Sequence, residues 1–91
     1  MNGIRVTTNP SAEELEAWGV FRWPVWEKEA SEFPWTYDEC ETCYILEGEV
    51  IVTPDGGAPV RIKERDLVVF PAGLSCRWQI LRDIRKHYRF G

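Results

Sequence analysis

The chain has 91 residues, a length typical of one domain, and a formal net charge of −4 at pH 7. No Lys/Arg cluster forms a phosphate-binding stripe, which argues against nucleic acid as a partner, and no apolar run approaches the ~20 residues that span a bilayer. Five Trp, four Phe and three Tyr supply enough bulky side chains for a core, and we expect one domain over residues 1–91.

The amino terminus and the cysteines bear on cellular location. Residues 1–5 lack the apolar segment of a signal peptide. Three Cys is an odd number, and Cys40 and Cys43 form a C-x-x-C pair without the second pair that a zinc site of this type requires. Such cysteine usage is typical of a reducing compartment, so we expect a cytoplasmic protein.

The first predicted elements are a short strand and the only helix. β-Branched residues at 4–8 favour a strand. Ser11 and Glu14 have the spacing of a capping box, which predicts a brief helix over residues 12–18. Gly19 is placed to end this helix in the left-handed conformation.

From residue 20 onward the pattern is typical of strands and turns. Gly48 separates Ile45-Leu46-Glu47 from Glu49-Val50-Ile51-Val52-Thr53, which predicts two strands with a tight reversal between them. Further breaks are expected at Asp55-Gly56-Gly57, Glu64-Arg65-Asp66 and Pro71-Ala72-Gly73. Later strands are expected at 60–63, 67–70, 76–80 and 84–90. Many short strands at close spacing indicate a β-sandwich or β-barrel.

The residues around Glu41 have a specific spacing. Glu41 is followed by six residues and then Gly48, and it is preceded by Trp35-x-Tyr37-x3. This arrangement resembles the first motif of the cupin family, G-x5-H-x-H-x(3,4)-E-x6-G. Trp35 and Tyr37 stand at the positions of two metal-binding His, and Glu29 stands at the position of the opening Gly.

A second spaced pattern follows. Arg65-x5-Pro71-x-Gly73-x2-Cys76 resembles the second cupin motif, G-x5-P-x-G-x2-H-x3-N. Arg replaces the first Gly, Cys76 replaces the His, and Ile80 replaces the Asn. The two motifs together imply an all-β fold, the RmlC-like jelly-roll barrel of cupins, with one short N-terminal helix.

The residues near these anchors narrow the resemblance to one group. Residues 23–27, 41–48, 73–78 and 85–88 are similar to small single-domain cupins grouped with the ureidoglycine aminohydrolase and ethanolamine-utilisation cupins. The resemblance covers nearly the whole chain from Trp18 onward. It implies a small, polar, nitrogen-containing metabolite as ligand and a homodimer that pairs through sheet edges. Cupins usually bind a metal through three His and one Glu, and of these four ligands the chain retains only the Glu, at position 41.

Strand alternation predicts which side chains share the barrel interior. One strand carries Glu41, Cys43 and Ile45 on one face, and a later strand carries Cys76, Trp78 and Ile80 on one face. If both faces turn inward, as the motif match implies, one cavity is lined by Glu41, Cys43, Cys76, Trp35, Tyr37 and Trp78.

Glu41 is the strongest candidate for chemistry. A carboxylate in an aromatic cavity is costly unless it is paired, ligates a metal or stays protonated, and such a group can act as a general acid or base. The alternative is a structural salt bridge with Lys86 or Arg77. Lys86 lies between Ile84 and Tyr88 on an apolar face, so it either binds a ligand carboxylate or rests its stem along the barrel wall.

Cys76 stands at a ligand position. As a ligand or nucleophile it needs a nearby cation, for which Lys86 is the candidate, to lower the thiol pKa below about 8.5. The alternative is a small buried hydrophobe. Cys43 is expected in the core, Cys40 in a loop without a role, and His87 on the surface.

Four aromatic residues form a candidate stacking box for a planar ligand: Trp26, Trp35, Tyr37 and Trp78. Packing of a small barrel explains the same residues. Trp35 and Tyr37 are the strongest ligand-binding candidates because they occupy metal-ligand positions of the motif.

Three functions stay open. The first is a small-molecule site in the barrel mouth that works without a metal, with Glu41 as acid or base, Cys76 as nucleophile or polar contact and Lys86 as anion anchor. The second is a metal site in which Glu41 and Cys76, with Cys43 as a further donor, select zinc or copper. The third is a non-catalytic structural or dimeric binding module whose barrel is filled by its own side chains. We expect the first.

Overall fold

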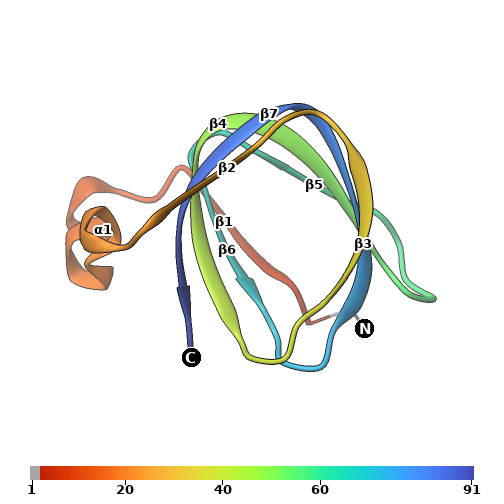
Figure 1. The fold of residues 1–91 in the computed structure, drawn as a ribbon. Helices are drawn as coiled ribbons and strands as arrows, with labels where there is room; N and C mark the ends of the chain where they lie inside the picture. Colours follow the sequence, from red (N-terminus) through yellow and green to blue (C-terminus); the bar gives the residue numbers. More distant parts are fainter. Residues whose placement is uncertain (1–2) are drawn as a thin grey trace.

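One antiparallel sheet, curved into a barrel, makes up most of residues 3–91, which are the residues described by this computed structural model (Figure 1). The elements are β1 (Arg5–Thr8), α1 (Ala12–Trp18), the 3₁₀ helix η1 (Val20–Arg22), β2 (Val25–Lys28), β3 (Glu32–Thr36), β4 (Glu41–Pro54), β5 (Val60–Lys63), β6 (Asp66–Phe70) and β7 (Ser75–Phe90). The expectation of an all-β jelly-roll with one short α-helix is confirmed. The signal-peptide argument rests partly on Met1 and Asn2, which lie outside the described residues.

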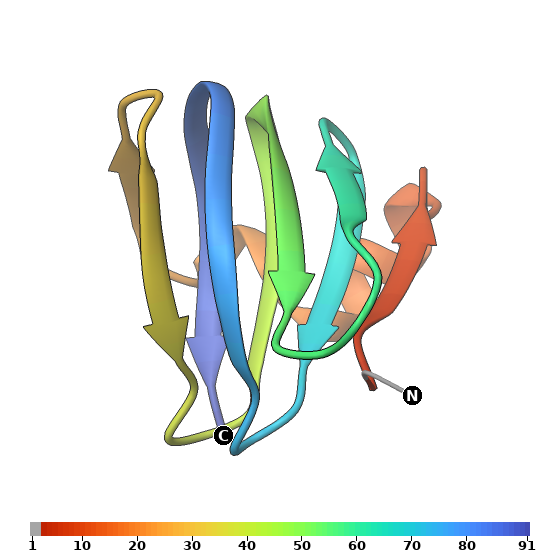
Figure 2. The same ribbon diagram turned by 90° about the vertical axis from the view of Figure 1, so that its right-hand side faces the viewer.

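The strand order places two long strands at the centre. The sheet runs β1-β6-β4-β7-β2, while β3 also pairs with β7 and β5 also pairs with β4. Figure 2 shows β3, the first half of β7, the second half of β4 and β5 side by side across one wall of the barrel. Since β7 pairs with β2, β3 and β4, it connects the elements that surround the site described below.

The N-terminal helix forms as its capping signals predict. The Ser11 hydroxyl accepts from the Glu14 backbone N–H, and the Glu14 carboxylate accepts from the Ser11 backbone N–H, each at 3.1 Å. Gly19 ends the helix with φ 74°. Leu15 packs on Val20 and on Leu67 of β6, so α1 lies against the outside of the barrel (Figure 1).

The tight reversal expected at Gly48 is wrong. The chain continues through Gly48 as a single strand, β4, and the register against β7 shifts there as in a β-bulge. Gly48 has φ 101°, which a bulge uses as readily as a turn does. The extra residue changes which side chains face inward: Cys43 and Ile45 are buried before the bulge, whereas Val50 and Val52 are buried after it.

The two strands expected at 76–80 and 84–90 are likewise one strand, β7, which bends opposite Gly48. A Cβ at Gly48 would lie 2.3 Å from the backbone oxygen of Asp83, so only glycine allows β4 and β7 to approach this closely.

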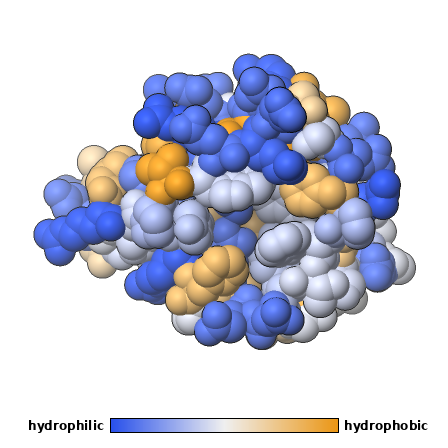
Figure 3. All heavy atoms as spheres, in the orientation of Figure 1, coloured by the Kyte–Doolittle hydropathy of each residue, from blue (hydrophilic) through white to orange (hydrophobic). Residues whose placement is uncertain are grey.

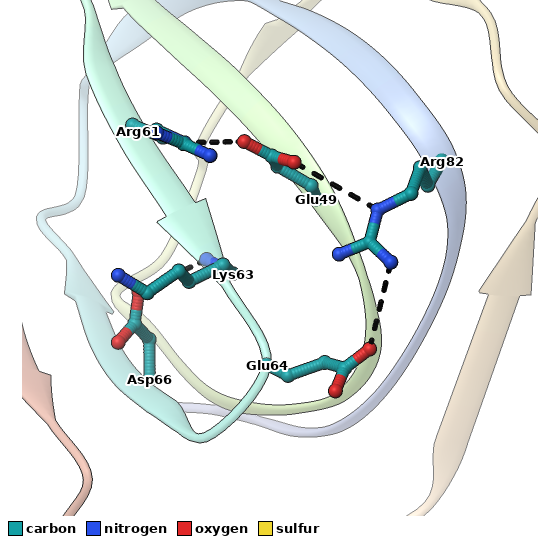
Figure 4. A network of polar contacts seen from close by, with 6 residues as sticks. All are labelled: Glu49, Arg61, Lys63, Glu64, Asp66 and Arg82. Atoms are coloured by element: carbon teal, nitrogen blue, oxygen red, sulfur yellow. Dashed lines mark hydrogen bonds and ion pairs between the residues drawn. The ribbon is translucent and has the colours of Figure 1, made fainter.

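Charged side chains join the strands next to this bend (Figure 4). Glu49 of β4 forms ion pairs with Arg61 of β5 and Arg82 of β7, and Arg82 also lies 3.9 Å from Glu64. In the turn below, the Asp66 carboxylate accepts from the Lys63 backbone N–H at 2.9 Å. These contacts tie β5 and the bend of β7 to β4.

The main core packs part of the barrel interior with side chains from β4, β5, β6 and β7 and with Tyr37. Its buried members are Tyr37, Cys43, Ile45, Val50, Val52, Ile62, Val68, Phe70, Cys76, Trp78, Ile80 and Ile84. Cys43 therefore lies in the core as expected. Within residues 3–91, neither helix has the length or apolar character needed to cross a bilayer.

Candidate functional site

A cavity of about 570 Å³ lies between β2, β3, the start of β4 and β7. This volume is in the usual range for small-molecule sites. The lining residues are Trp26, Glu27, Lys28, Phe33, Pro34, Trp35, Tyr37, Glu41, Trp78, Lys86, Tyr88 and Phe90. Most are aromatic, so the cavity offers apolar walls with a few polar groups.

On the surface in the view of Figure 1, hydrophilic residues gather along the upper edge, while paler and apolar residues occupy the middle (Figure 3).

Glu41 and Lys86 form a buried ion pair in this cavity. Lys86 Nζ donates to Glu41 Oε2 at 2.7 Å, and the two residues are only 5% and 3% exposed, respectively. Glu41 is the first residue of β4. Lys86 of β7 pairs with Ile45 of β4, and it lies on the same face of β7 as Tyr88, two residues further along. The other partner considered for Glu41, Arg77, instead pairs with Glu32 at the surface. Of the two salt-bridge partners considered for Glu41, the structure thus pairs it with Lys86.

Two indole rings hold the Lys86 ammonium group. Nζ lies 4.9 Å from the ring centroid of Trp26 and 4.8 Å from that of Trp78, and the two rings meet edge to face. Cation–π attraction at desolvated sites is worth about 2 kcal/mol or more. The stacking box expected from the sequence therefore has its inner part occupied by the protein's own cation.

Tyr37 adds a neutral hydroxyl to the cavity wall. Its ring stacks on Phe70 with centroids 4.8 Å apart, and its oxygen accepts from Trp78 Nε1 at 3.2 Å. Burial, and next the charge of Glu41, raise the pKa of Tyr37 well above its ordinary value. Tyr37 consequently remains a protonated phenol whose own O–H is a donor.

Trp35 stands at the entrance. It is 48% exposed, and its ring meets that of Tyr37 edge to face at 6.4 Å. Trp35 and Tyr37, the two aromatic residues at metal-ligand positions of the motif, therefore lie in contact at the cavity, one near the solvent and one inside.

The structure does not bring the buried cysteines into the cavity lining. Cys43 and Cys76 are both absent from the lining residues among positions 3–91, and the Cys76 thiol lies 3.5 Å from the backbone oxygen of Trp35. Burial raises the pKa of Cys76 to about 11, with Asp55 as the next cause, and raises that of Cys43 to about 12. The pKa of Cys76 is thus raised, not lowered, so the expected activation of Cys76 by Lys86 is wrong.

His87 differs from its expected surface position. It is half-buried, its Nδ1 lies 2.8 Å from the backbone oxygen of Trp23, and the Phe21 ring meets it edge to face. The alternation of β7 does turn His87 outward, but residues 20–23 cover that face. The sequence did contain a signal for this cover, because Trp18, Phe21 and Trp23 lie between β1 and β2 and need an apolar surface on the outside of the barrel. Cys40 lies in the loop before β4, as expected.

The residues present do not fit the metal site that cupins commonly hold. Trp35, Tyr37 and Cys76 replace the three His, and the Lys86 ammonium is within hydrogen-bond distance of the only retained ligand, Glu41. A cation in that place repels a divalent metal ion. Moreover, the described part of the chain contains no group of three or more His, Cys, Asp or Glu arranged to hold a metal.

Three solved structures illustrate the similarity of the chain to known proteins. A DUF861 family protein from Thermotoga maritima is 50% identical, with a TM-score of 0.93 over 97% of this chain and 99% of that one. A putative ethanolamine utilization protein Q from Salmonella typhimurium is 27% identical, with a TM-score of 0.65 over 72% of this chain and 53% of that one. The EutQ protein of Clostridium difficile, at 19% identity and a TM-score of 0.67, shares the fold over 96% of this chain and 66% of that one.

The chain thus spans nearly all of the Thermotoga protein but about half of the Salmonella protein. No curated protein matches it. The model of the EutQ-like cupin domain matches residues 15–88, which include every lining residue of the cavity except Phe90. This chain belongs to the EutQ-like cupin family.

Proposed function

We propose that this cupin binds a small, polar, nitrogen-containing molecule in the aromatic cavity, without a metal. The observation that carries the proposal is the buried Glu41–Lys86 pair, which lines a cavity large enough for a metabolite. Burying an ion pair lowers the stability of the fold by several kcal/mol through desolvation, and apolar residues of similar size would pack there at least as well. Its presence in a cavity is therefore better explained by ligand recognition than by packing.

The pair also indicates the kind of polar group that it would bind. Glu41 supplies an acceptor and Lys86 supplies donors 2.7 Å away, so an N–H beside a C=O would meet both partners. Amides and ureido groups have that arrangement, and they are planar. Trp35 and Phe33 on β3 offer rings for stacking at the side of the cavity.

We assign roles on this basis. Glu41 accepts the ligand N–H and acts as general acid or base if the site is catalytic. Lys86 holds the ligand oxygen, Tyr37 donates from its hydroxyl, and Trp35 covers the ligand at the entrance. Cys76 has no direct contact with the ligand in this proposal, because its thiol points to the Trp35 backbone and burial keeps it protonated.

The cavity argues against the alternative of a barrel filled by its own side chains. A volume of about 570 Å³ is many times that of a single water molecule. The mismatch between the donor set and a metal argues against the zinc or copper alternative.

We further propose that the protein is a cytoplasmic homodimer. Its cysteines at 40, 43 and 76 are all free thiols, as suits a reducing compartment. The strand β1 ends the sheet and is exposed along its full length, and an edge of that kind needs a partner or a cover.

Binding is tested by titrating small amides, ureido compounds and amino acids while recording tryptophan fluorescence, because three lining residues are Trp. We expect at least one compound to saturate the signal, and Glu41→Gln to weaken its affinity by about tenfold or more, as loss of a charged hydrogen bond implies. Glu32→Gln, which breaks the exposed pair with Arg77, is the matched control and should change nothing. A panel without any saturable response, or affinities equal in Glu41→Gln and wild type, would contradict the proposal.

A further inference from the structure

We propose that Lys86 forms a protonated Schiff base with a small aldehyde that enters the cavity. The inference rests on the proposed function in one respect: small molecules must reach the cavity. It assigns Lys86 a covalent role that simple binding does not require.

The position of the amine is the first argument. Lys86 is one of three lysines, and it is 5% exposed, whereas Lys63 projects from the surface. Its Nζ lies against the rings of Trp26 and Trp78 and lines a cavity that an aldehyde of a few carbons would fit. A lysine amine held in an apolar pocket is the usual setting for imine chemistry.

Charge complementarity is the second argument. An iminium ion carries the same single positive charge as the ammonium ion that it replaces. It therefore keeps the attraction to both indole rings and to the Glu41 carboxylate. In water an iminium is readily hydrolysed, but here a counter-ion and two aromatic faces are already arranged around the nitrogen. The site is electrostatically complementary to the product of the reaction as well as to the free lysine.

The proton path is the third argument. Glu41 Oε2 accepts a hydrogen bond from Lys86 Nζ at 2.7 Å, so the carboxylate can take a proton from the ammonium along that bond. The free amine then attacks the carbonyl carbon. A C–N bond forms, the carbonyl electron pair moves to oxygen, and the oxygen takes up the proton that the attacking nitrogen loses, giving a neutral carbinolamine.

Glu41 returns its proton to the carbinolamine hydroxyl, which leaves as water while the nitrogen lone pair forms the C=N bond. Overall, one ammonium and one aldehyde give one iminium and one water, so charge is conserved and no oxidant, reductant or cofactor is needed. Tyr37, on the same cavity wall, keeps its O–H and is a donor for the carbonyl oxygen.

Reductive trapping tests the proposal. The protein is incubated with limiting propanal and cyanoborohydride, and modified lysines are located by peptide mass mapping. We expect Lys86 to be modified at least about tenfold faster than Lys63, since a positioned acid–base partner typically contributes more than that. Lys63, which is exposed and does not line the cavity, serves as the internal control in the same sample. Modification of Lys63 as fast as Lys86 would overturn the proposal.

Variants separate a covalent role from a structural one. Lys86→Arg retains a cation and should abolish the fast adduct, whereas Lys63→Arg should leave it unchanged. Glu41→Gln should slow trapping at Lys86 by about a hundredfold, because the proton acceptor is lost. Near-UV circular dichroism shows whether each variant keeps its packed aromatic cavity. If a variant unfolds, the comparison of Lys86 with Lys63 in the wild-type protein still tests the proposal.

The two proposals fail in different ways. If amides or ureido compounds bind but Lys86 is not trapped preferentially, the Schiff-base inference is wrong and the binding proposal stands. If Lys86 is trapped and no compound of the panel binds, the ligand class of the binding proposal is wrong. If neither signal appears, both proposals fall.

Discussion

Lys86 occupies a place on β7 where the neighbouring inward positions carry apolar side chains, and its environment explains why it is tolerated there. The alternation of Ile84, Lys86 and Tyr88 already predicted an inward lysine. The same alternation turns Arg77 outward, away from Trp78, which argues against Arg77 as a partner of Glu41, whereas its pairing with Glu32 depends on the register of β3 on β7. The contact between Glu41 and Lys86 was only one of several possibilities, because 45 residues separate them and the sequence does not give the register of β4 on β7.

Removing one member of the buried pair should destabilise the fold strongly. We expect Lys86→Met to lower the free energy of unfolding by about 3–5 kcal/mol, because Glu41 is left buried without a partner. Urea denaturation measures the change. The double variant with Glu41→Gln should recover most of the loss, while Glu32→Gln, which breaks an exposed pair, should cost no more than about 1 kcal/mol. Equal losses in Lys86→Met and Glu32→Gln would show that the pair is not buried in solution.

The two buried thiols predict a loss of stability at alkaline pH. Their pKa values are raised in the folded state, so above the ordinary thiol pKa of about 8.5 the unfolded chain releases protons that the folded chain retains. Stability should therefore fall as pH rises from about 8.5 toward the folded values of about 11 and about 12.

Urea midpoints between pH 7 and 10, measured with reductant present, check this expectation. Cys76→Ala removes one of the two titrating thiols and should make the decline shallower. Cys40→Ala is the control, since Cys40 lies in a loop, and it should leave the slope unchanged. A slope that is the same in Cys76→Ala and wild type would contradict the burial of the Cys76 thiol.

At the scale of elements, local signals predicted α1 correctly and misplaced the end of a strand at Gly48. The capping box and Gly19 act within one helical turn, so the residues that decide the helix are neighbours in sequence. Gly48 gives the same local signal for a turn and for a bulge, because both use a positive φ. The choice is made by β7, whose bend at Asp83 accommodates the bulge and lies far away in sequence.

The bulge gives a prediction with a close control. Gly48→Ala should destabilise the protein by about 2–4 kcal/mol, because strain at positive φ adds to a collision with the Asp83 backbone oxygen. Gly73 also has a positive φ, 85°, but a Cβ there meets nothing within 4 Å. Gly73→Ala should therefore show the strain alone, about 1–2 kcal/mol. Equal effects on the thermal midpoint would show that β4 and β7 are not in close contact at the bend.

At the scale of the whole molecule, the proposed homodimer can be checked directly. Light scattering coupled to size exclusion should give twice the chain mass of 10.6 kDa. If β1 is the contact edge, Val6→Lys should shift the protein toward monomer by placing a charge on that edge. Leu81→Lys is the matched control, since Leu81 is similarly exposed (42% against 37%) but lies at the bend of β7. A wild-type monomer would contradict the dimer, and equal effects of the two variants would exclude the β1 edge.

The pairing of β4 with β7 also has a consequence for synthesis on the ribosome. Glu41 emerges 45 residues before Lys86, which corresponds to about 2–9 s of translation. During that interval the edge of β4 that pairs with β7 is open, and the carboxylate of Glu41 stays hydrated. The nascent chain is thus most prone to aggregation at this stage, and rare codons between β4 and β7 should lower the soluble yield more than rare codons before β4.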